Sequence, residues 1–225
     1  MSGFHRIAGI DEAGRGPMLG PMVVCGVLFS KEGYRELEGI DVRDSKLLTP
    51  KRRAELYEKI RESASRIAIR TIRAEEIDGK RGRGVSLNHI EAVAFGSVLK
   101  ELKPDIVYVD AADVDSLRFG ETISRFSGLT PGKCKIISEH KADQTYAVVS
   151  AASIVAKVMR DRAIEKLYAD FGDIGSGYPG DQKSIRFVRE CVRAKKIPSF
   201  VRRSWEPVRV IIEQFSTRQL KLDEV

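Results

Sequence analysis

The sequence is poor in cysteine and contains no long apolar run. Its 225 residues include three cysteines, Cys25, Cys134 and Cys191, and no Cys-x-x-Cys pair. That spacing argues against a disulfide scaffold or a thiolate zinc site and indicates a reducing compartment. The best apolar run, MVVCGVLF, has the length of a strand, whereas a membrane helix needs roughly 18 apolar residues. The N-terminus also lacks a basic-then-apolar secretion signal, so we expect a cytoplasmic protein.

Basic residues outnumber acidic ones. The formal net charge of +7 predicts a polyanionic partner. Residues 181–206 hold eight lysines and arginines against three acidic residues. Within them Arg186, Arg189 and Arg193 recur at helical spacing, which predicts one organised basic face. An ordinary solvated helix face is the alternative.

Periodicity predicts alternating strands and helices. Together they indicate an α/β fold, a mixed five-stranded sheet flanked by helices, with a small helical C-terminal subdomain. The Gly-rich segment GDIGSGYPGD separates a domain at 1–172 from a basic helical, substrate-binding subdomain at 173–225. The expected strands are 6–11, 22–29, 65–74, 104–110 and 133–140, and the expected helices are 49–64, 86–102 and 145–172.

Four acidic residues lie at or just beyond predicted strand ends: Asp11, Glu12, Asp110 and Asp143. Open α/β sheets place their sites at that edge. Each residue alone is most simply a turn or N-cap carboxylate. Together they would repel unless cations neutralised them, and oxygen ligands without His or Cys suit Mg²⁺ or Mn²⁺. Two such ions would form a clamp for phosphodiester hydrolysis.

The segment GIDEAGRGP raises one objection and offers one binding element. Neighbouring strand residues point to opposite faces, so Asp11 and Glu12 can share a site only if the strand ends or twists at Glu12. Gly14 directly afterwards makes such a break feasible. The loop Gly14-Arg15-Gly16 is no nucleotide P-loop, but its N–H groups and Arg15 could hold a phosphate.

Five motifs now point to a family. GIDEAGRGPMLGPMVV, VRDSKLLTPKRR, YVDAAD, EHKADQTYAVVSAASIVAKVMRDR and GSGYPGD follow one another in order. The chain resembles type 2 ribonuclease H (ribonuclease HII), archaeal branch, from about residue 6 to about residue 212, and RRSWEPV is similar to a segment of archaeal and eukaryotic relatives.

The resemblance implies an RNase H-like fold and a metal-dependent endoribonuclease. Such enzymes cut the RNA strand of RNA–DNA hybrids and cut 5′ of single ribonucleotides in duplex DNA, leaving 5′-phosphate and 3′-hydroxyl ends. The implied metal ligands are the same four acids. The implied substrate contacts are Gly14, Arg15 and Gly16 around the cut, and Tyr178 on the sugar at the RNA-to-DNA junction.

Other interpretations follow from the same residues. Lys46 in DSK could bind a phosphate or be a surface lysine. In-line attack by a metal-activated water would have Asp11 bridging the two ions, Asp143 completing one site, and Glu12 with Asp110 the other. The chain is expected to be monomeric. Its tail has Gln219 and Leu222 at the spacing of a sliding-clamp peptide without the aromatic residues, so clamp contact is doubtful.

Two other functions remain open. One is another nuclease of the same fold, such as a junction resolvase, which would not explain Gly14-Arg15-Gly16 together with GYPGD. The other is a non-catalytic module that binds hybrids. Four acids near a phosphate backbone argue against it, because pure binding favours fewer negative charges there.

Overall fold

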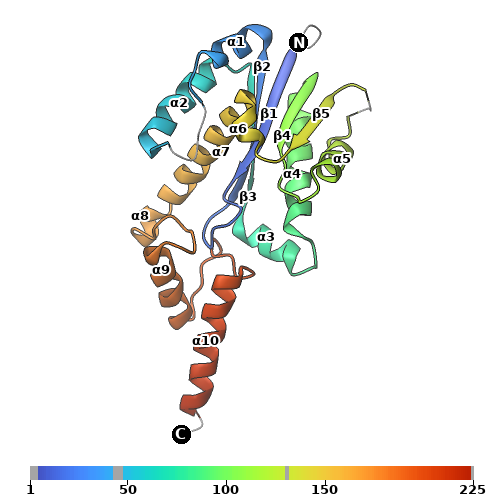
Figure 1. Ribbon diagram of the computed structural model, residues 1–225. Helices are drawn as coiled ribbons and strands as arrows, with labels where there is room; N and C mark the ends of the chain where they lie inside the picture. Colours follow the sequence, from blue (N-terminus) through green and yellow to red (C-terminus); the bar gives the residue numbers. More distant parts are fainter. Residues whose placement is uncertain (1–4, 43–47, 130–131, 224–225) are drawn as a thin grey trace. The chain divides into compact units, whose positions relative to one another are not determined.

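The computed structural model describes residues 5–42, 48–129 and 132–223. The chain forms two compact units (Figure 1). The first, here called the sheet unit, comprises Met1–Ala13, Val23–Thr71 and Leu87–Met159. The second, the helical unit, comprises Gly14–Met22, Ile72–Ser86 and Arg160–Val225. The functional division at residues 172 and 173 stays a prediction.

A five-stranded mixed sheet forms the centre of the sheet unit, as the sequence predicts. Its order is β3-β2-β1-β4-β5. β1 is antiparallel to β2 and parallel to β4, and β4 is parallel to β5. The carboxyl ends of these three parallel strands therefore lie at one edge of the sheet. The bounds are β1 Arg6–Ala13, β2 Met22–Ser30, β3 Arg66–Ile72, β4 Ile106–Asp110 and β5 Lys135–Glu139.

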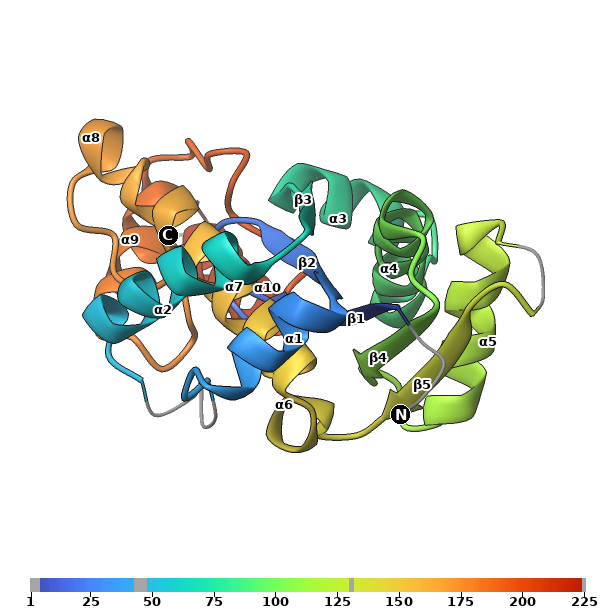
Figure 2. The same ribbon diagram turned by 90° about the horizontal axis from the view of Figure 1, so that it is seen from above.

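Helices cover both faces of this sheet (Figure 2). On one face lie α4 (Leu87–Leu102) and α5 (Ser116–Ser127), where a side chain at Gly26 of β2 would collide with Val98. On the other face, α1 (Lys31–Glu38), α2 (Pro50–Ser63) and the start of α7 (Ala147–Glu165) share one buried apolar cluster with β1 and β2. A short helix, α6 (Ala142–Thr145), follows β5.

The helical unit contains α3 (Ala74–Arg81), α8 (Tyr168–Phe171), α9 (Gln182–Arg193) and α10 (Glu206–Asp223). Its buried core is formed by Met18, Leu19, Ile174, Val188, Val201, Val208 and Ile211. In α9, Val188 points into this core while Arg186, Arg189 and Arg193 are exposed. The predicted basic face is therefore present.

The predicted helix at 145–172 is divided in the structure. Tyr146 has extended dihedrals (φ −115°, ψ 118°), so α6 ends there and α7 begins after it. α7 itself ends at Glu165, and the following α8 places Phe171 against Phe187 and Phe200, with ring centroids 5.9 and 4.9 Å away. Packing of Phe171 in the helical unit thus overrides the continuous helical periodicity.

Other features expected from the sequence can be compared directly with the structure. The helix expected at 49–64 is α2, which Thr49 caps and which begins at Pro50. The short helices α1, α3 and α5 were not expected. The three cysteines are free. Among the described residues, no helix is both long and apolar enough to cross a membrane.

Two glycine-to-alanine variants, at Gly9 and at Gly79, together test how closely β1 approaches α7. A Cβ at Gly9 would lie 2.1 Å from the backbone oxygen of Val148, so Gly9→Ala requires β1 and α7 to separate. We expect a loss of about 1–3 kcal/mol in the free energy of unfolding, measured in urea. The control is Gly79→Ala in α3, where nothing lies within 4 Å. This variant should gain up to about 1 kcal/mol. Equal stabilities would contradict the close approach.

Candidate active site

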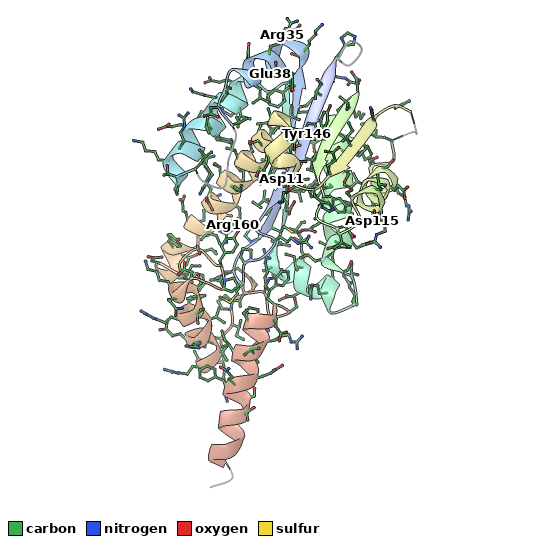
Figure 3. All side chains as sticks on the ribbon, viewed as in Figure 1. Asp11, Arg35, Glu38, Asp115, Tyr146 and Arg160 are labelled. Carbon is green, nitrogen blue, oxygen red and sulfur yellow. The ribbon has the colours of Figure 1, made fainter. Side chains whose placement is uncertain are left out.

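β1 places Asp11 inside the sheet unit (Figure 3). Asp11 pairs with Cys25 of β2 and is 4% exposed. It lies two residues after Gly9 and so on the same face, which packs on α7. The Ser153 hydroxyl of α7 hydrogen-bonds to its carboxylate, and the Glu12 backbone N–H donates to Asp11 Oδ1 at 2.7 Å. The Asp11 side chain is therefore held from both sides.

Asp110 and Asp143 come from two neighbouring segments, the end of β4 and the helix α6 that follows β5. Asp110 is the last residue of β4, and its Oδ1 accepts a hydrogen bond from the Ala142 N–H at 2.9 Å. That bond ties the start of α6 to the end of β4. Helix α6 begins after a turn at Lys141, whose φ of 58° lies in the left-handed region. Asp143, next in α6, is buried with 6% exposure.

These three aspartates form one group, here called the carboxylate cluster. Their ligand oxygens all lie within 4.8 Å of one another. Burial raises the pKa of Asp11 well above its ordinary value, and the charges of Glu12 and Asp110 raise it further. Clustered carboxylate oxygens are the ligands that hard divalent cations prefer. The cluster is thus a site of the kind that holds such a cation.

Glu12 lies outside the carboxylate cluster. The expected end of the strand at Glu12 is wrong, because β1 continues in regular register through Glu12 and Ala13. Its side chain therefore alternates to the other face from Asp11. Its charge is nevertheless close enough to raise the pKa of Asp11. A role of Glu12 as a metal ligand stays a prediction.

The predicted substrate residues gather in the helical unit. Residues 14–16, the Gly-Arg-Gly loop, begin with Gly14 at φ 84°, where a Cβ would lie 2.6 Å from the backbone oxygen of Pro21. Gly16 is exposed, and a Cβ there would lie 3.9 Å from Tyr178 Cε1. Gly16 and the Tyr178 ring are therefore near neighbours, and the roles of both residues in substrate binding stay predictions. Lys46 lies outside the described residues.

Residues 175–181, the Tyr178 loop, are fastened from two directions. The Gly177 carbonyl accepts hydrogen bonds from the backbone N–H groups of Met18 and Leu19, at 2.7 and 3.3 Å. Buried Arg160 donates to the Ser176 carbonyl at 2.5 Å and places its guanidinium 5.0 Å from the centre of the Tyr178 ring. Tyr178 remains 43% exposed, so part of its ring is available to a ligand.

Sequence analysis did not identify Ser153 or Arg160. Ser153 lies in a run of small residues, a pattern that is typical of close helix packing but indicates no specific contact. Arg160 lies in the helical segment VMRDR, where an arginine is typically exposed. Both roles depend on tertiary contacts that periodicity does not contain.

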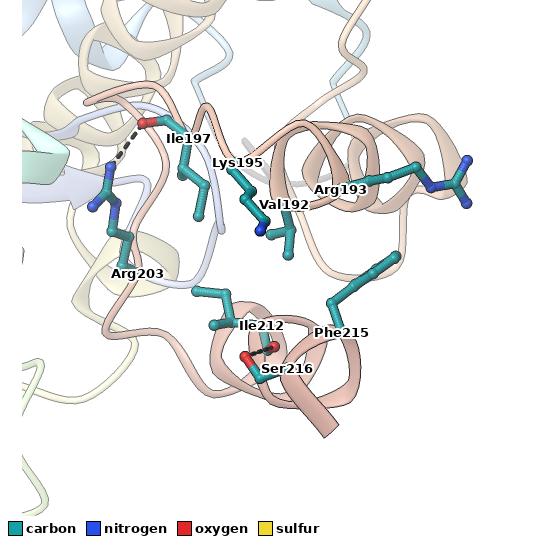
Figure 4. A pocket seen from close by; sticks show the side chains of 8 residues that line it. All are labelled: Val192, Arg193, Lys195, Ile197, Arg203, Ile212, Phe215 and Ser216. Atoms are coloured by element: carbon teal, nitrogen blue, oxygen red, sulfur yellow. Dashed lines mark hydrogen bonds between the residues drawn. The ribbon is translucent and has the colours of Figure 1, made fainter. Parts of the chain in front are cut away.

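A basic pocket of about 330 Å³ opens between α9 and α10 of the helical unit (Figure 4). Arg203 donates to the Ile197 carbonyl at its rim at 2.8 Å, and the Arg193 guanidinium lies 5.9 Å from the centre of the Phe215 ring. The pocket is lined by Val192, Arg193, Lys195, Ile197, Arg203, Ile212, Phe215 and Ser216. These charges extend the basic surface of α9.

Comparison with known proteins now decides the family. The Ribonuclease HII profile matches residues 8–208. The chain belongs to the ribonuclease HII family. Ribonuclease HII of Thermococcus onnurineus is 46% identical over 219 residues, which cover 96% of this chain and 94% of that protein. This ribonuclease HII is therefore a ribonuclease H, a hydrolase whose substrates are RNA–DNA hybrids.

Solved ribonuclease HII structures share the fold. The ribonuclease H2 of Pyrococcus horikoshii OT3 matches with a TM-score of 0.85 and 41% identity, covering 94% of this chain and 99% of that one. The enzyme in the PCNA:RNase HII complex of Archaeoglobus fulgidus matches with a TM-score of 0.81 and 40% identity, covering 89% and 95%. The RNase H-like fold implied by the motifs is thus confirmed.

Repulsion in the carboxylate cluster should lower the free energy of unfolding of the wild type. A raised pKa means that folding favours protonated Asp11, so stability falls as the pH rises from the ordinary aspartate pKa of about 3.9 toward the raised value. Asp110→Asn keeps the acceptor for the Ala142 N–H and removes one charge. In chelator at pH 8 we expect this variant to be more stable by about 1 kcal/mol, or about 2–4 °C in Tm. The gain should vanish near pH 3.

Asp105→Asn is the control, and its expected change in stability at pH 8 has the opposite sign. Burial works against ionisation of Asp105, but hydrogen bonds from the His5 and Arg6 backbone and the Arg6 guanidinium lower its pKa. This variant should therefore lose stability at pH 8. Added Mg²⁺ should raise the Tm of the wild type and of Asp105→Asn more than that of Asp110→Asn. A wild type more stable than Asp110→Asn in chelator would contradict the repulsion.

Proposed function

We propose that this ribonuclease HII, besides acting on RNA–DNA hybrids, cuts on the 5′ side of single ribonucleotides embedded in duplex DNA. The products would carry 5′-phosphate and 3′-hydroxyl ends. The observation that carries the proposal is the carboxylate cluster at the carboxyl edge of the parallel strands. The nearness of Gly16 to the Tyr178 ring supports the recognition of a junction.

The carboxylate cluster fits Mg²⁺ or Mn²⁺ by its donor set. Asp11 would be shared between two ions, Asp143 would belong to one site, and Asp110 with Glu12 to the other. Two such ions supply an activated water and stabilise the departing 3′-oxygen. The buried setting of Asp11 and its bonds from Ser153 and Glu12 orient its oxygens before any ion binds.

The helical unit would read the sugar. A ribonuclease must recognise the 2′-hydroxyl, the group that distinguishes RNA from DNA. Gly16 has no side chain and is exposed, so a ribose can approach its backbone, while Arg15 can hold the adjacent phosphate. The exposed part of the Tyr178 ring can pack on the neighbouring deoxyribose.

The basic face of α9 would hold the duplex. Arg186, Arg189 and Arg193 are exposed on one helix, and such charges bind the phosphate backbone without reading sequence. This assigns substrate binding to residues 173–225 and catalysis to residues 1–172, together with the Gly-Arg-Gly loop. Lys46 as a phosphate contact is part of the same proposal.

A DNA duplex with one ribonucleotide tests the proposed function. With Mg²⁺ or Mn²⁺ we expect one cut, 5′ of the ribonucleotide, and none in chelator or on all-DNA duplex. Asp110→Asn and Asp143→Asn should each lower the rate at least about 10²-fold, because each removes a charged ligand. Binding of the duplex in chelator should persist in both variants. Cleavage of branched all-DNA substrates would instead favour a junction resolvase, and binding without any cleavage a non-catalytic module.

Tyr178→Ala separates junction recognition from the chemistry. Removing the ring should lower cleavage of the single-ribonucleotide duplex about 10-fold or more, since a stacking contact contributes about 1–3 kcal/mol. Cleavage of a long RNA–DNA hybrid should change less. Tyr34→Ala in α1, a tyrosine of the sheet unit outside the Tyr178 loop, is the control. An equal loss on both substrates would contradict junction recognition by Tyr178.

Monomeric state and clamp contact stay predictions. The relative from Archaeoglobus fulgidus was solved in complex with PCNA. In this chain, Val225 stands at the first aromatic position of the spacing set by Gln219 and Leu222. We therefore propose that residues 219–225 contribute little to the binding of a sliding clamp.

A further inference from the structure

Arg202 is the largest fully buried side chain in the described structure, with 0% exposure. Its guanidinium donates three hydrogen bonds to backbone carbonyls of the first loop of the helical unit. Nε binds the Gly20 oxygen at 3.1 Å, Nη1 the Arg15 oxygen at 3.0 Å and Nη2 the Gly14 oxygen at 2.6 Å. One side chain thus holds residues that precede it by more than 180 positions.

Trp205 completes this arrangement. Its indole N–H donates to the Gly16 carbonyl at 3.1 Å, so the consecutive carbonyls of residues 14–16 all accept from Arg202 or Trp205. The Arg202 guanidinium carbon lies 4.8 Å from the centre of the indole ring, and that of Arg81 lies 5.1 Å from it. Asp78 of α3 accepts hydrogen bonds from the backbone of Arg203 and Ser204, which fixes the intervening segment.

Burying a guanidinium costs desolvation free energy, which its hydrogen bonds must offset. Burial is the main cause that lowers the pKa of Arg202 to about 10. An apolar side chain of similar volume would avoid this desolvation, but it could not bind three carbonyls. Each planar peptide unit joins the carbonyl of one residue to the N–H of the next, so fixing the carbonyls of Gly14 and Arg15 also fixes the directions of the N–H groups of Arg15 and Gly16. The arginine therefore determines the loop's conformation and not only its packing.

We propose that Arg202 and Trp205 are positioning residues that set the Gly-Arg-Gly loop in its substrate-binding conformation before the nucleic acid arrives. The inference rests on the proposed role of this loop at the cut. A loop held in advance loses less conformational entropy on binding, and it presents the scissile nucleotide in one orientation. Most affinity should come from phosphate contacts elsewhere, so the pair should govern the cleavage step.

The test uses single-turnover cleavage of the single-ribonucleotide duplex with saturating enzyme. Under this condition the rate constant describes the bound complex and does not depend on the fraction of folded enzyme. Arg202→Lys keeps the charge but loses the three-way donor geometry. Trp205→Phe keeps a ring but removes the N–H. Arg61→Lys is the matched control, because Arg61 is exposed, lies in α2 of the sheet unit and pairs with Glu58 of its own helix.

We expect rate constants about 10–100-fold lower for Arg202→Lys and about 3–10-fold lower for Trp205→Phe, since small misplacement of reacting groups has effects of this order. Dissociation constants measured in chelator should stay within about threefold for both variants, and the control should match the wild type. Trp205 is the sole tryptophan, so a red shift of its emission in Arg202→Lys reports the loss of this contact.

Unchanged single-turnover rates in folded variants would overturn the inference. So would equal losses of rate and affinity, which would indicate a general structural role. If Arg202→Lys does not fold, Trp205→Phe decides alone. Failure of the proposed function is distinguishable, because the wild type itself would then leave the single-ribonucleotide duplex uncut.

Discussion

The direct contact between the β1 backbone and the first turn of α7 determines where the rest of the site can form. Gly9 leaves no space for a side chain against Val148, so strand and helix backbones touch. Two residues further along β1, Asp11 therefore lies within reach of the Ser153 hydroxyl. The parallel neighbours β4 and β5 then bring Asp110 and Asp143 to the same edge.

That edge is electrostatically unfavourable when the protein is alone. Oxygens of three carboxylates lie within 4.8 Å of one another, and burial adds to their mutual repulsion. Hydrogen bonds from Ser153 and from the backbone of Glu12 and Ala142 offset part of it. The sheet and its helices supply the remaining free energy, so the site is held ready for cations by packing that lies outside it.

Strand ends alone predicted the three clustered aspartates, because parallel strands necessarily bring their carboxyl ends together. The sheet followed equally from alternating strands and helices. Glu12 was harder, since adjacency in sequence says nothing of which face a residue takes unless the strand's end is known. Arg202 could not have been predicted: RRSWEPV contains two adjacent arginines, and only the tertiary fold buries one and exposes the other. The break between α7 and α8 was likewise decided by distant aromatic rings.

The long sequence separation between the Gly-Arg-Gly loop and Arg202 affects when the loop can reach its fixed conformation during synthesis. The donors to the carbonyls of residues 14–16 come more than 180 positions later in the chain, at residues 202 and 205. A nascent chain, or one truncated before that segment, can carry all three clustered aspartates without the groups that fix the loop. During synthesis the loop can therefore reach its fixed conformation only after residue 205 has been made, later than all three clustered aspartates.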